Sequence, residues 1–221
     1  MNILIFGATG MVGQGVLREC LLSPEVTSVR AVVRSSTGVV HDKFKEIIHG
    51  DMFDLSPVAN RLGGVDACLF VLGVSSFRMT EETYTRLTYD LTMSVATVLD
   101  RLNPGMRFEY VSGAGTDSTE EGKSMWARVK GRTENALLRL FPGRAFMFRP
   151  GVIQALNGAK TKTPLYNAAY IVLSPVIGLL RRAYPRTILD TERVGRAMVN
   201  VAARGFSKPI LETGDIADAA G

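Results

Sequence analysis

The sequence predicts an α/β fold in which helices cover both faces of a doubly wound parallel sheet. Between residues 2 and 151, short apolar segments alternate with longer segments of helical periodicity, and such alternation is typical of a parallel sheet. The segment 66–74 is apolar almost throughout, as expected of a central strand buried on both faces. A glycine-rich turn joins the first apolar segment to the first helical one, which is typical of a nucleotide-binding α/β unit.

The composition fits one domain with a sizeable core. The chain has 221 residues, of which 46% are hydrophobic, and its net charge is +5. This mildly basic charge suits an anionic ligand such as a nucleotide. The lysines and arginines are scattered without an aromatic-interleaved patch, so nucleic acid is not predicted as a partner. Cys20 and Cys68 lie in apolar patterns and are expected to be buried thiols in a reducing compartment.

Neither a metal site nor a membrane span is predicted. His41 and His49 have no clustered metal-ligating partners at suitable spacing. The N-terminal apolar run is too short for a signal sequence and has no basic residues before it. The most apolar stretch, residues 168–180, is shorter than the ~20 residues that span a bilayer and contains Pro175. We therefore expect a cytoplasmic protein in which this stretch is a covering helix.

The first strand and the turn after it carry the clearest ligand motif. Residues 2–6 predict a buried strand, and a helical stripe through Val16 and Cys20 follows the spacing G-x-x-G-x-x-G. Gly7 permits the tight turn, Gly10 lets the backbone approach a pyrophosphate, and Gly13 allows the helix to pack closely on the strand. The positive end of the helix dipole would face the anion. We predict that a dinucleotide contacts Gly7, Thr9, Gly10, Met11, Val12 and Gly13.

The second strand, residues 29–33, ends at Arg34. In turns that bind NAD, an Asp or Glu about 20 residues further on holds the ribose 2′-hydroxyl. Arg34 stands at this strand end instead, and an arginine can bind a 2′-phosphate. A charge-assisted hydrogen bond of this kind contributes roughly 1.5–3 kcal/mol, or about ten- to a hundredfold in affinity. The sequence thus favours NADP over NAD, against the alternative that Arg34 is a solvated arginine.

Two further strand ends contribute to the predicted cofactor site. Residues 44–49 predict a third strand, and Asp51 and Met52 follow it at the carboxyl end, where ligands bind in such sheets. The fourth strand, residues 66–74, contains Gly73 near its end, where a missing side chain would let the backbone approach the cofactor. Thr80 then caps a long helix that extends to residue 102 and stops at Asn103-Pro104-Gly105.

The remaining elements follow in the same order. Residues 107–112 predict a strand, residues 116–122 a polar loop, residues 124–141 a helix and residues 144–151 the sixth strand. Beyond Gly151 the pattern changes, and residues 152–190 predict a small substrate-side annex whose segment 160–185 would supply the substrate pocket as a helical lid. A helix over residues 191–203 with Thr191 as its cap, a late strand over 209–213 and a frayed tail over 216–221 complete the chain.

Taken together, these motifs resemble the short-chain dehydrogenase/reductase superfamily, especially its atypical NAD(P)-binding group near the epimerase/dehydratase and Tat-interacting-oxidoreductase types. The resemblance covers residues 1–155 well, and it implies a Rossmann fold that binds NAD(P) but leaves the substrate open. The matching stretches are Gly7-Ala8-Thr9-Gly10 with Gly13, Gly50-Asp51, Val111-Ser112-Gly113, Lys130 and Arg149-Pro150-Gly151.

The resemblance also implies roles for two residues and exposes one departure. Ser112 matches the family's serine, which positions the substrate carbonyl. Lys130 matches the lysine that holds the nicotinamide ribose and lowers the pKa of a catalytic tyrosine four residues earlier. Trp126 occupies that tyrosine position. An indole N–H can donate a hydrogen bond but cannot transfer a proton near neutral pH, so the family's usual acid/base step has no tyrosine here.

Trp126 leaves three interpretations open. Another group, such as Tyr84, Tyr89 or a water held by Ser112, acts as the acid; or the substrate needs no protein acid; or the protein binds NADP(H) without turnover, as a sensor or scaffold. Tyr110 is expected to be a core tyrosine of its strand. Retained Ser112 and Lys130 favour an oxidoreductase acting on a small carbonyl or hydroxyl substrate. By family analogy, helix 80–102 is a candidate surface for a homodimer.

Overall fold

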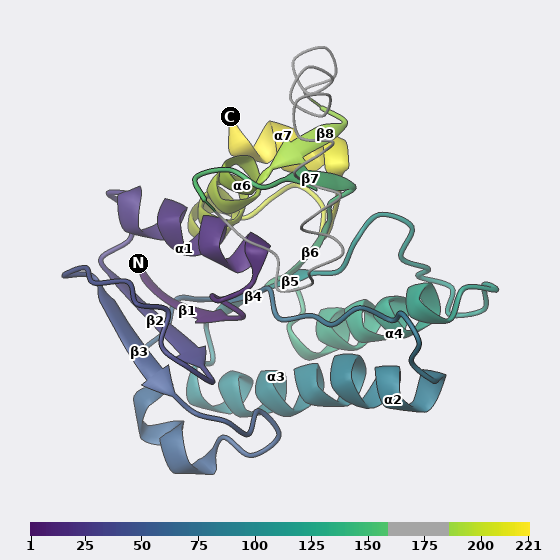
Figure 1. The fold of residues 1–221 in the computed structure, drawn as a ribbon, viewed down its shortest axis with the longest axis horizontal. Coiled ribbons are helices and arrows are strands. Elements are labelled where there is room, and N and C mark those ends of the chain that lie inside the picture. Colours follow the sequence, from purple (N-terminus) through teal and green to yellow (C-terminus); the bar gives the residue numbers. More distant parts are fainter. Residues whose placement is uncertain (159–185) are drawn as a thin grey trace.

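A computed structural model describes residues 1–158 and 186–221 of the chain. Seven parallel strands form its main sheet in the order β3-β2-β1-β4-β5-β6-β9. Helices α1, α6 and α7 cover one face, and α2, α3 and α4 cover the other (Figure 1). The predicted doubly wound parallel sheet is therefore confirmed. The predicted helical lid and the proposed pocket segment 160–185 lie outside the described residues.

The first half of the chain follows the predicted order closely. Its elements are β1 (Asn2–Phe6), α1 (Met11–Leu22), β2 (Ser28–Val33), β3 (Phe44–Ile48), the short 3-10 helix η1 (Ser56–Arg61) and β4 (Ala67–Phe70). The predicted fourth strand, residues 66–74, was too long, because β4 leaves the sheet after Phe70. The chain beyond it turns along the carboxyl edge of the sheet and borders a pocket there.

The long helix predicted over residues 80–102 is present but not uniform. It consists of α2 (Glu81–Thr85), the π-helical turn η2 (Arg86–Asp90) and α3 (Leu91–Leu102). The predicted cap is confirmed, because the Thr80 hydroxyl accepts a hydrogen bond of 3.3 Å from the backbone N–H of Thr83. The hydrophobic periodicity of a π-helical turn does not differ from that of an α-helix, so the sequence did not reveal it. Such turns occur as local bulges within longer helices.

The second half contains β5 (Arg107–Val111), α4 (Met125–Leu140), β6 (Ala145–Arg149), β7 (Val152–Gln154), β8 (Ile188–Asp190), α6 (Thr191–Arg204), β9 (Ile210–Glu212) and α7 (Thr213–Ala220). Strands β7 and β8 form a separate parallel pair that the sequence analysis did not predict. Three-residue strands are too short to show an alternating pattern.

Two predictions about the C-terminal part are wrong. The cap of α6 is Asp190 rather than Thr191, because the Asp190 carboxylate accepts a hydrogen bond of 2.8 Å from the Arg193 N–H. The tail predicted to fray forms α7 instead. Reciprocal hydrogen bonds between Glu212 and Asp215 cap the start of α7, and Ile216 is fully buried, so the segment is held by the core as well as by its cap.

The helices on one face are joined by close backbone contact. A Cβ atom added to Gly15 of α1 would lie 2.5 Å from the Thr191 carbonyl oxygen at the start of α6. A Cβ added to Gly195 of α6 would lie 2.9 Å from the Gly15 carbonyl oxygen. Real Cβ atoms do not approach other atoms this closely, so the two glycines let the helices touch backbone to backbone. Helix α1 is therefore packed tightly against α6.

Apolar side chains fill both layers between sheet and helices. Cys20 packs in the layer under α1 and α6 and Cys68 in the layer above α3, and both thiols are fully buried, as predicted. Glu109 of β5 is also fully buried. Its neighbours Phe108 and Tyr110 belong to the α3 layer, so by strand alternation Glu109 faces the α1 and α6 layer. No helix among the described residues is long and apolar enough to cross a membrane.

Candidate functional site

A pocket of about 270 Å³ lies where the carboxyl ends of β1, β2 and β4 meet the segment after β3. It lies where the strand order reverses, between β1 and β4, and ligands bind at such reversals in open parallel sheets. Phe53 and Leu87 contribute to its apolar wall. The pocket brings together six of the predicted cofactor residues, from four separate segments: Gly7, Thr9, Arg34, Asp51, Met52 and Gly73.

The glycine turn has the geometry that its spacing predicts. Gly7 has φ +93°, and a Cβ there would lie 2.6 Å from the backbone nitrogen of Leu72. A Cβ on Gly13 would lie 2.0 Å from the Gly7 carbonyl oxygen, so only glycine lets α1 start this close to the strand. Gly10 precedes α1 and supplies no side-chain cap. The backbone around Gly10 and the first amides of α1, at Met11 and Val12, form a site suited to an anion.

The segment after Arg34 is held in place by a carboxylate on β3. Glu46 accepts hydrogen bonds from the Thr37 N–H at 2.6 Å and from the Thr37 hydroxyl at 2.5 Å. The hydrogen bond from the Thr37 side chain lowers the pKa of Glu46. These bonds fix the turn that places Arg34, Ser35 and Ser36 beside the glycine motif.

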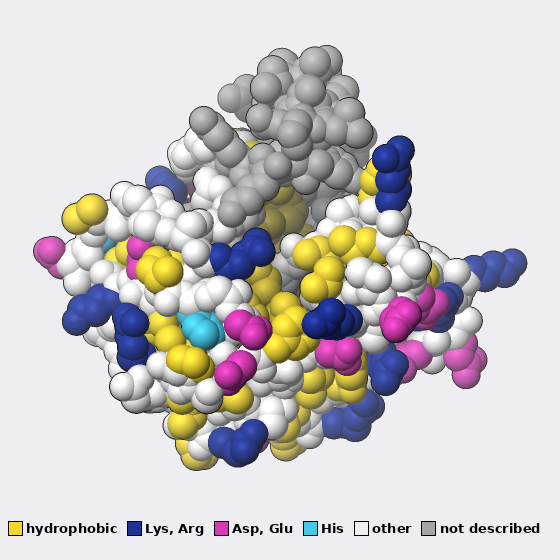
Figure 2. Space-filling model, turned by 60° about the horizontal axis from the view of Figure 1, so that its bottom comes forward, with side chains coloured by type: hydrophobic (Ala, Val, Ile, Leu, Met, Phe, Trp, Pro, Cys, Tyr) yellow, Lys and Arg dark blue, Asp and Glu magenta, His cyan; other side chains and the backbone are white. Residues whose placement is uncertain are grey.

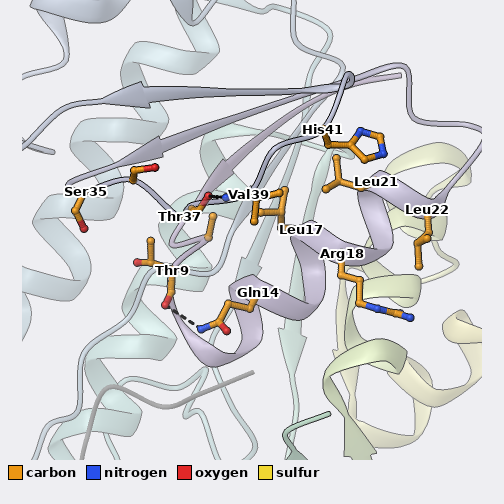
Figure 3. A pocket seen from close by; sticks show the side chains of 12 residues that line it. Thr9, Gln14, Leu17, Arg18, Leu21, Leu22, Ser35, Thr37, Val39 and His41 are labelled. Carbon is orange, nitrogen blue, oxygen red and sulfur yellow. Dashed lines mark hydrogen bonds between the residues drawn. The ribbon is translucent and has the colours of Figure 1, made fainter. Parts of the chain in front are cut away.

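A second and larger pocket, of about 760 Å³, lies between α1 and the segment after β2 (Figure 3). It shares Thr9 with the first pocket. Leu17 and Leu21 of α1 face Val39 across it, and His41 lies at its rim (Figure 3). This pocket was not predicted, although Val39 and Val40, which are exposed in an otherwise polar turn, are a signal of an apolar surface there.

On the face drawn in Figure 2, described lysine and arginine side chains are interspersed with acidic ones and do not gather into one basic patch. This distribution agrees with the scattered charges of the sequence and gives no support to a nucleic-acid surface on this face. Among the described residues, no three histidine, cysteine or acidic side chains are grouped as metal ligands.

The structure brings Ser112 and Lys130 together, as the family motif implies. The Lys130 ammonium donates a hydrogen bond to the Ser112 carbonyl oxygen. Burial lowers the pKa of Lys130 to about 8, and the Glu134 carboxylate opposes this shift. The Ser112 hydroxyl, however, faces inward. Ser112 is only 5% exposed. Its Oγ lies within hydrogen-bond distance of two acceptors, the Glu134 carboxylate at 2.5 Å and the Phe148 carbonyl oxygen at 3.2 Å.

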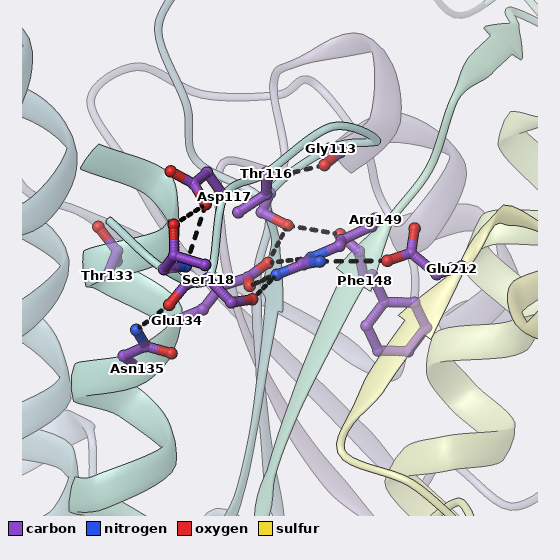
Figure 4. Close-up of polar contacts among 12 residues, drawn as sticks. Gly113, Thr116, Asp117, Ser118, Thr133, Glu134, Asn135, Phe148, Arg149 and Glu212 are labelled. Carbon is purple, nitrogen blue, oxygen red and sulfur yellow. Dashed lines mark hydrogen bonds and ion pairs between the residues drawn. The ribbon is translucent and has the colours of Figure 1, made fainter. Parts of the chain in front are cut away.

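Glu134 forms the centre of a buried polar network that the sequence analysis missed (Figure 4). Its carboxylate accepts hydrogen bonds of 2.5–3.2 Å from the Arg149 guanidinium, as well as the one from Ser112. Arg149 also donates to Glu212 at 3.1 Å and to the Ser118 hydroxyl at 2.5 Å. The signal was present in the sequence: Glu134 lies four residues after Lys130, and Arg149 ends an otherwise apolar strand.

Neither tyrosine proposed as an alternative acid lines one of the two pockets described above. Tyr84 is 2% exposed and burial raises its pKa, which disfavours it as the acid. The ring of Tyr89 lies under the Arg132 guanidinium, 4.4 Å from it, and lines neither pocket described above. Tyr110 is a core residue, as predicted. Trp126 packs over the turn after β5, where a Cβ on Gly115 would lie 3.5 Å from the indole ring.

No protein-family model matches the chain, but solved structures do. A dTDP-glucose 4,6-dehydratase from Streptomyces venezuelae, solved with NAD bound, is 18% identical with a TM-score of 0.70, over 99% of this chain and 80% of that one. A short-chain dehydrogenase/reductase-family oxidoreductase from Burkholderia thailandensis is 18% identical with a TM-score of 0.68, over 97% and 92%. A short-chain dehydrogenase/reductase from Saccharomyces cerevisiae is 15% identical with a TM-score of 0.63, over 98% of each chain.

At these identities the likeness establishes the fold. The chain has a Rossmann-like α/β fold, as do the short-chain dehydrogenase/reductase, epimerase and dehydratase structures that it is similar to. The resemblance inferred from Gly7 to Gly13 and from the later motifs is thereby confirmed at the level of architecture.

Proposed function

We propose that the protein is an NADP(H)-binding oxidoreductase that acts on a small carbonyl or hydroxyl compound. The pocket at the β1/β4 reversal is the observation that carries this proposal, because it gathers predicted cofactor residues from four segments. The cofactor would supply the hydride chemistry, and the protein would bind, orient and polarise.

The residues around the glycine turn fit a dinucleotide. The close approach of Gly13 to Gly7 leaves no room for a side chain, which brings the amides of α1 next to the place that a pyrophosphate would occupy. Asp51 and Met52 would border the adenosine. The protein backbone at Gly73, which carries no side chain, would lie against the cofactor. Lys130 would hold the nicotinamide ribose, as its position in the family motif implies.

Arg34 supports NADP as the cofactor. Among the residues that line the first pocket, Arg34 is the basic one and Asp51 the acidic one. Asp51 follows β3, so it does not stand at the end of β2, where the acid that binds the ribose of NAD is expected. The hydroxyl residues Ser35 and Ser36 come directly after Arg34 and line the neighbouring pocket. A guanidinium with adjacent hydroxyls suits a phosphate monoester, whereas a ribose 2′-hydroxyl is normally bound by a carboxylate at this strand end.

The cofactor proposal is tested by titrating NADPH and NADH while their fluorescence is followed. We expect NADPH to bind about ten- to a hundredfold more tightly, and Arg34→Glu to remove this preference. Arg139→Glu, at an exposed position near the end of α4, makes the same charge change away from the pocket and should leave the preference intact. Equal affinities for both cofactors in the parent protein would refute the role of Arg34.

Trp126 and the inward-facing Ser112 hydroxyl favour a second candidate function, an NADP(H)-binding sensor or scaffold without turnover. A screen of carbonyl compounds that follows NADPH oxidation separates the two. We expect the parent protein to oxidise NADPH with at least one class of compound. A protein that binds NADPH tightly and oxidises it with none would favour the sensor. If turnover occurs and Trp126→Tyr does not raise it, the tryptophan is not what limits the site.

A further inference from the structure

The proposed function uses only one end of the pocket of about 760 Å³ beside α1. This pocket shares Thr9 with the candidate cofactor pocket, but its lining continues along α1 as far as Leu22, the last residue of the helix. At 1.5 Å per residue, Leu22 lies about 16 Å along the helix axis from Met11. Most of the pocket therefore lies away from the glycine turn.

The middle of the pocket is apolar and open to water. Leu17 and Leu21 of α1 face Val39 across it (Figure 3), and these three side chains are called the apolar wall below. Val39 is 40% exposed, and Leu22 at the far end is 62% exposed. Apolar side chains that surround a hollow without filling it are typical of a ligand site, and small-molecule pockets measure about 300–1,000 Å³.

Hydrogen bonds fix the pocket at both ends. At the end near the cofactor pocket, the Glu46 carboxylate holds Thr37. At the other end, the Lys43 ammonium donates to the carbonyl oxygens of Leu21 at 3.3 Å and Ser23 at 2.8 Å. These bonds join the segment after β2 to the end of α1. The pocket is thus formed before a ligand binds, as small-molecule sites usually are.

The polar groups indicate how a ligand would be oriented. Thr9 and Ser35 lie at the end near the cofactor pocket, and Leu22 and His41 lie at the opposite end (Figure 3). No acidic side chain is among the described residues that line the pocket. Arg34, which is exposed, precedes Ser35 and lines the adjoining pocket. A guanidinium beside a hydroxyl suits the anionic head of a ligand.

The second arginine at this pocket, Arg18, is already paired. Its guanidinium contacts Glu19 and lies 3.4 Å from the Glu192 carboxylate. An anion placed beside Arg18 would meet two like charges, which opposes its binding there. The anionic head therefore belongs at the Arg34 end.

We propose that this pocket binds a free medium-chain carboxylate. The carboxylate head lies at Arg34 and Ser35, and the alkyl chain lies along the apolar wall. The ligand competes with NADPH, because its head takes the groups that the 2′-phosphate would use. This competition rests on the proposed function, whereas the binding of the carboxylate does not.

The first experiment titrates the protein with decanoate by isothermal calorimetry, below the concentration at which decanoate forms micelles. Each methylene group buried by the apolar wall adds about fourfold in affinity, so hexanoate, octanoate and decanoate should bind with rising affinity. Decyltrimethylammonium has the same chain with the opposite charge and should bind at least about tenfold more weakly. Affinities that do not depend on chain length, or not on charge, would overturn the proposal.

A matched pair of variants tests the location. Val39→Asp places an acid in the apolar wall. Val40→Asp makes the same change one residue further on, at a side chain that is 97% exposed and is not among the lining residues. We expect Val39→Asp to weaken decanoate binding about tenfold or more and Val40→Asp to bind like the parent. Both positions are exposed, so both variants should fold. Equal decanoate binding by the two variants would contradict the location.

Competition with NADPH tests the position of the carboxylate head. With decanoate at about ten times its Kd, the apparent Kd of NADPH should rise about tenfold by mass action. Arg34→Glu should weaken the binding of decanoate as well as that of NADPH. If decanoate binds and leaves the NADPH titration unchanged, the head does not lie at Arg34 and the proposal is wrong.

The outcomes separate this inference from the proposed function. A protein that does not bind NADPH contradicts the proposed function, and the decanoate titrations of the parent, Val39→Asp and Val40→Asp then decide on the pocket alone. A protein that binds NADPH but none of the alkyl carboxylates keeps the proposed function and refutes the carboxylate site.

Discussion

At the scale of single residues, Glu109 is the most unusual group in the sheet. It lies in the middle of β5, is fully buried, and neither carboxylate oxygen has a hydrogen-bond partner among the described residues. Burial raises its pKa well above the ordinary value, and the charge of Arg107 only partly opposes this. A carboxyl in this position is expected to hold its proton at neutral pH, so it sits in the core as a neutral acid.

This environment predicts a pH-dependent stability. The folded protein binds the Glu109 proton more tightly than the unfolded chain, so between the two pKa values the folded state holds more protons and its stability falls as pH rises. We expect the free energy of unfolding, measured with urea from about pH 5 upward, to fall less steeply with pH in Glu109→Gln than in the parent.

Two further variants sharpen this measurement. Glu109→Met removes the polar group at similar volume and should stabilise the protein by about 1–3 kcal/mol near pH 7. Glu121→Gln, at an exposed acid, should keep the pH slope of the parent. Identical slopes in the parent and in Glu109→Gln would show that Glu109 is not the buried acid described here.

At the scale of elements, the glycine turn before α1 combines two separate constraints. Gly13 has no room for a Cβ because the Gly7 carbonyl oxygen occupies that place. Gly10 has an extended backbone with φ −79°, and a Cβ there would lie 3.4 Å from the same oxygen. Gly13 is therefore needed by the fold itself, whereas we propose that Gly10 serves a ligand that approaches the turn.

The two substitutions should separate these constraints. Gly13→Ala forces α1 away from the strand, and we expect a loss of about 1–3 kcal/mol in unfolding free energy together with weaker NADPH binding. Gly10→Ala should change the stability of the free protein little and still weaken NADPH binding. Thermal unfolding and a fluorescence titration measure both. If Gly10→Ala binds NADPH normally, the pyrophosphate does not lie at this turn.

The elements also show what the sequence could and could not predict. The six main strands and the helices between them were predictable, because buried parallel strands are continuous apolar runs and the helices carry regular stripes. Strands β7 and β8 were not, because their three residues show no pattern. Asp190 and Thr191 are both good capping residues. The structure distinguishes them because Asp190 has an extended backbone, whereas Thr191 is already the first residue of α6. Ile216 belongs to a helix because distant core residues bury it.

At the scale of the whole molecule, the candidate site divides into a predictable and an unpredictable part. The cofactor side follows from glycine spacing and from strand ends, which topology alone brings together. The network of Ser112, Glu134 and Arg149 joins side chains from β5, α4 and β6. No local pattern reports such a pairing. The family motif correctly placed Ser112 next to Lys130, yet which way the hydroxyl points depends on Glu134.

Cofactor binding should stabilise the whole domain by mass action. At a free NADPH concentration of about a hundred times its Kd, the folded state gains about 2.7 kcal/mol, which corresponds to a rise in Tm of roughly 5–10 °C for a domain of this size. Scanning calorimetry with and without NADPH measures this shift. The same concentration of NADPH should stabilise Arg34→Glu much less, and an unchanged Tm in the parent would argue against tight binding.

The glycine contact between α1 and α6 has a mechanical consequence. Helix α1 presents its amino end to the candidate pyrophosphate site, and α6 starts directly after β8, on the side where the substrate annex was predicted. At Gly15 and Gly195 the backbones of the two helices approach each other closely, with the Thr191 and Glu19 side chains packed beside them, so this contact has little room to slide. The amino end of α1 and the strand leading into α6 should therefore move together as one rigid body.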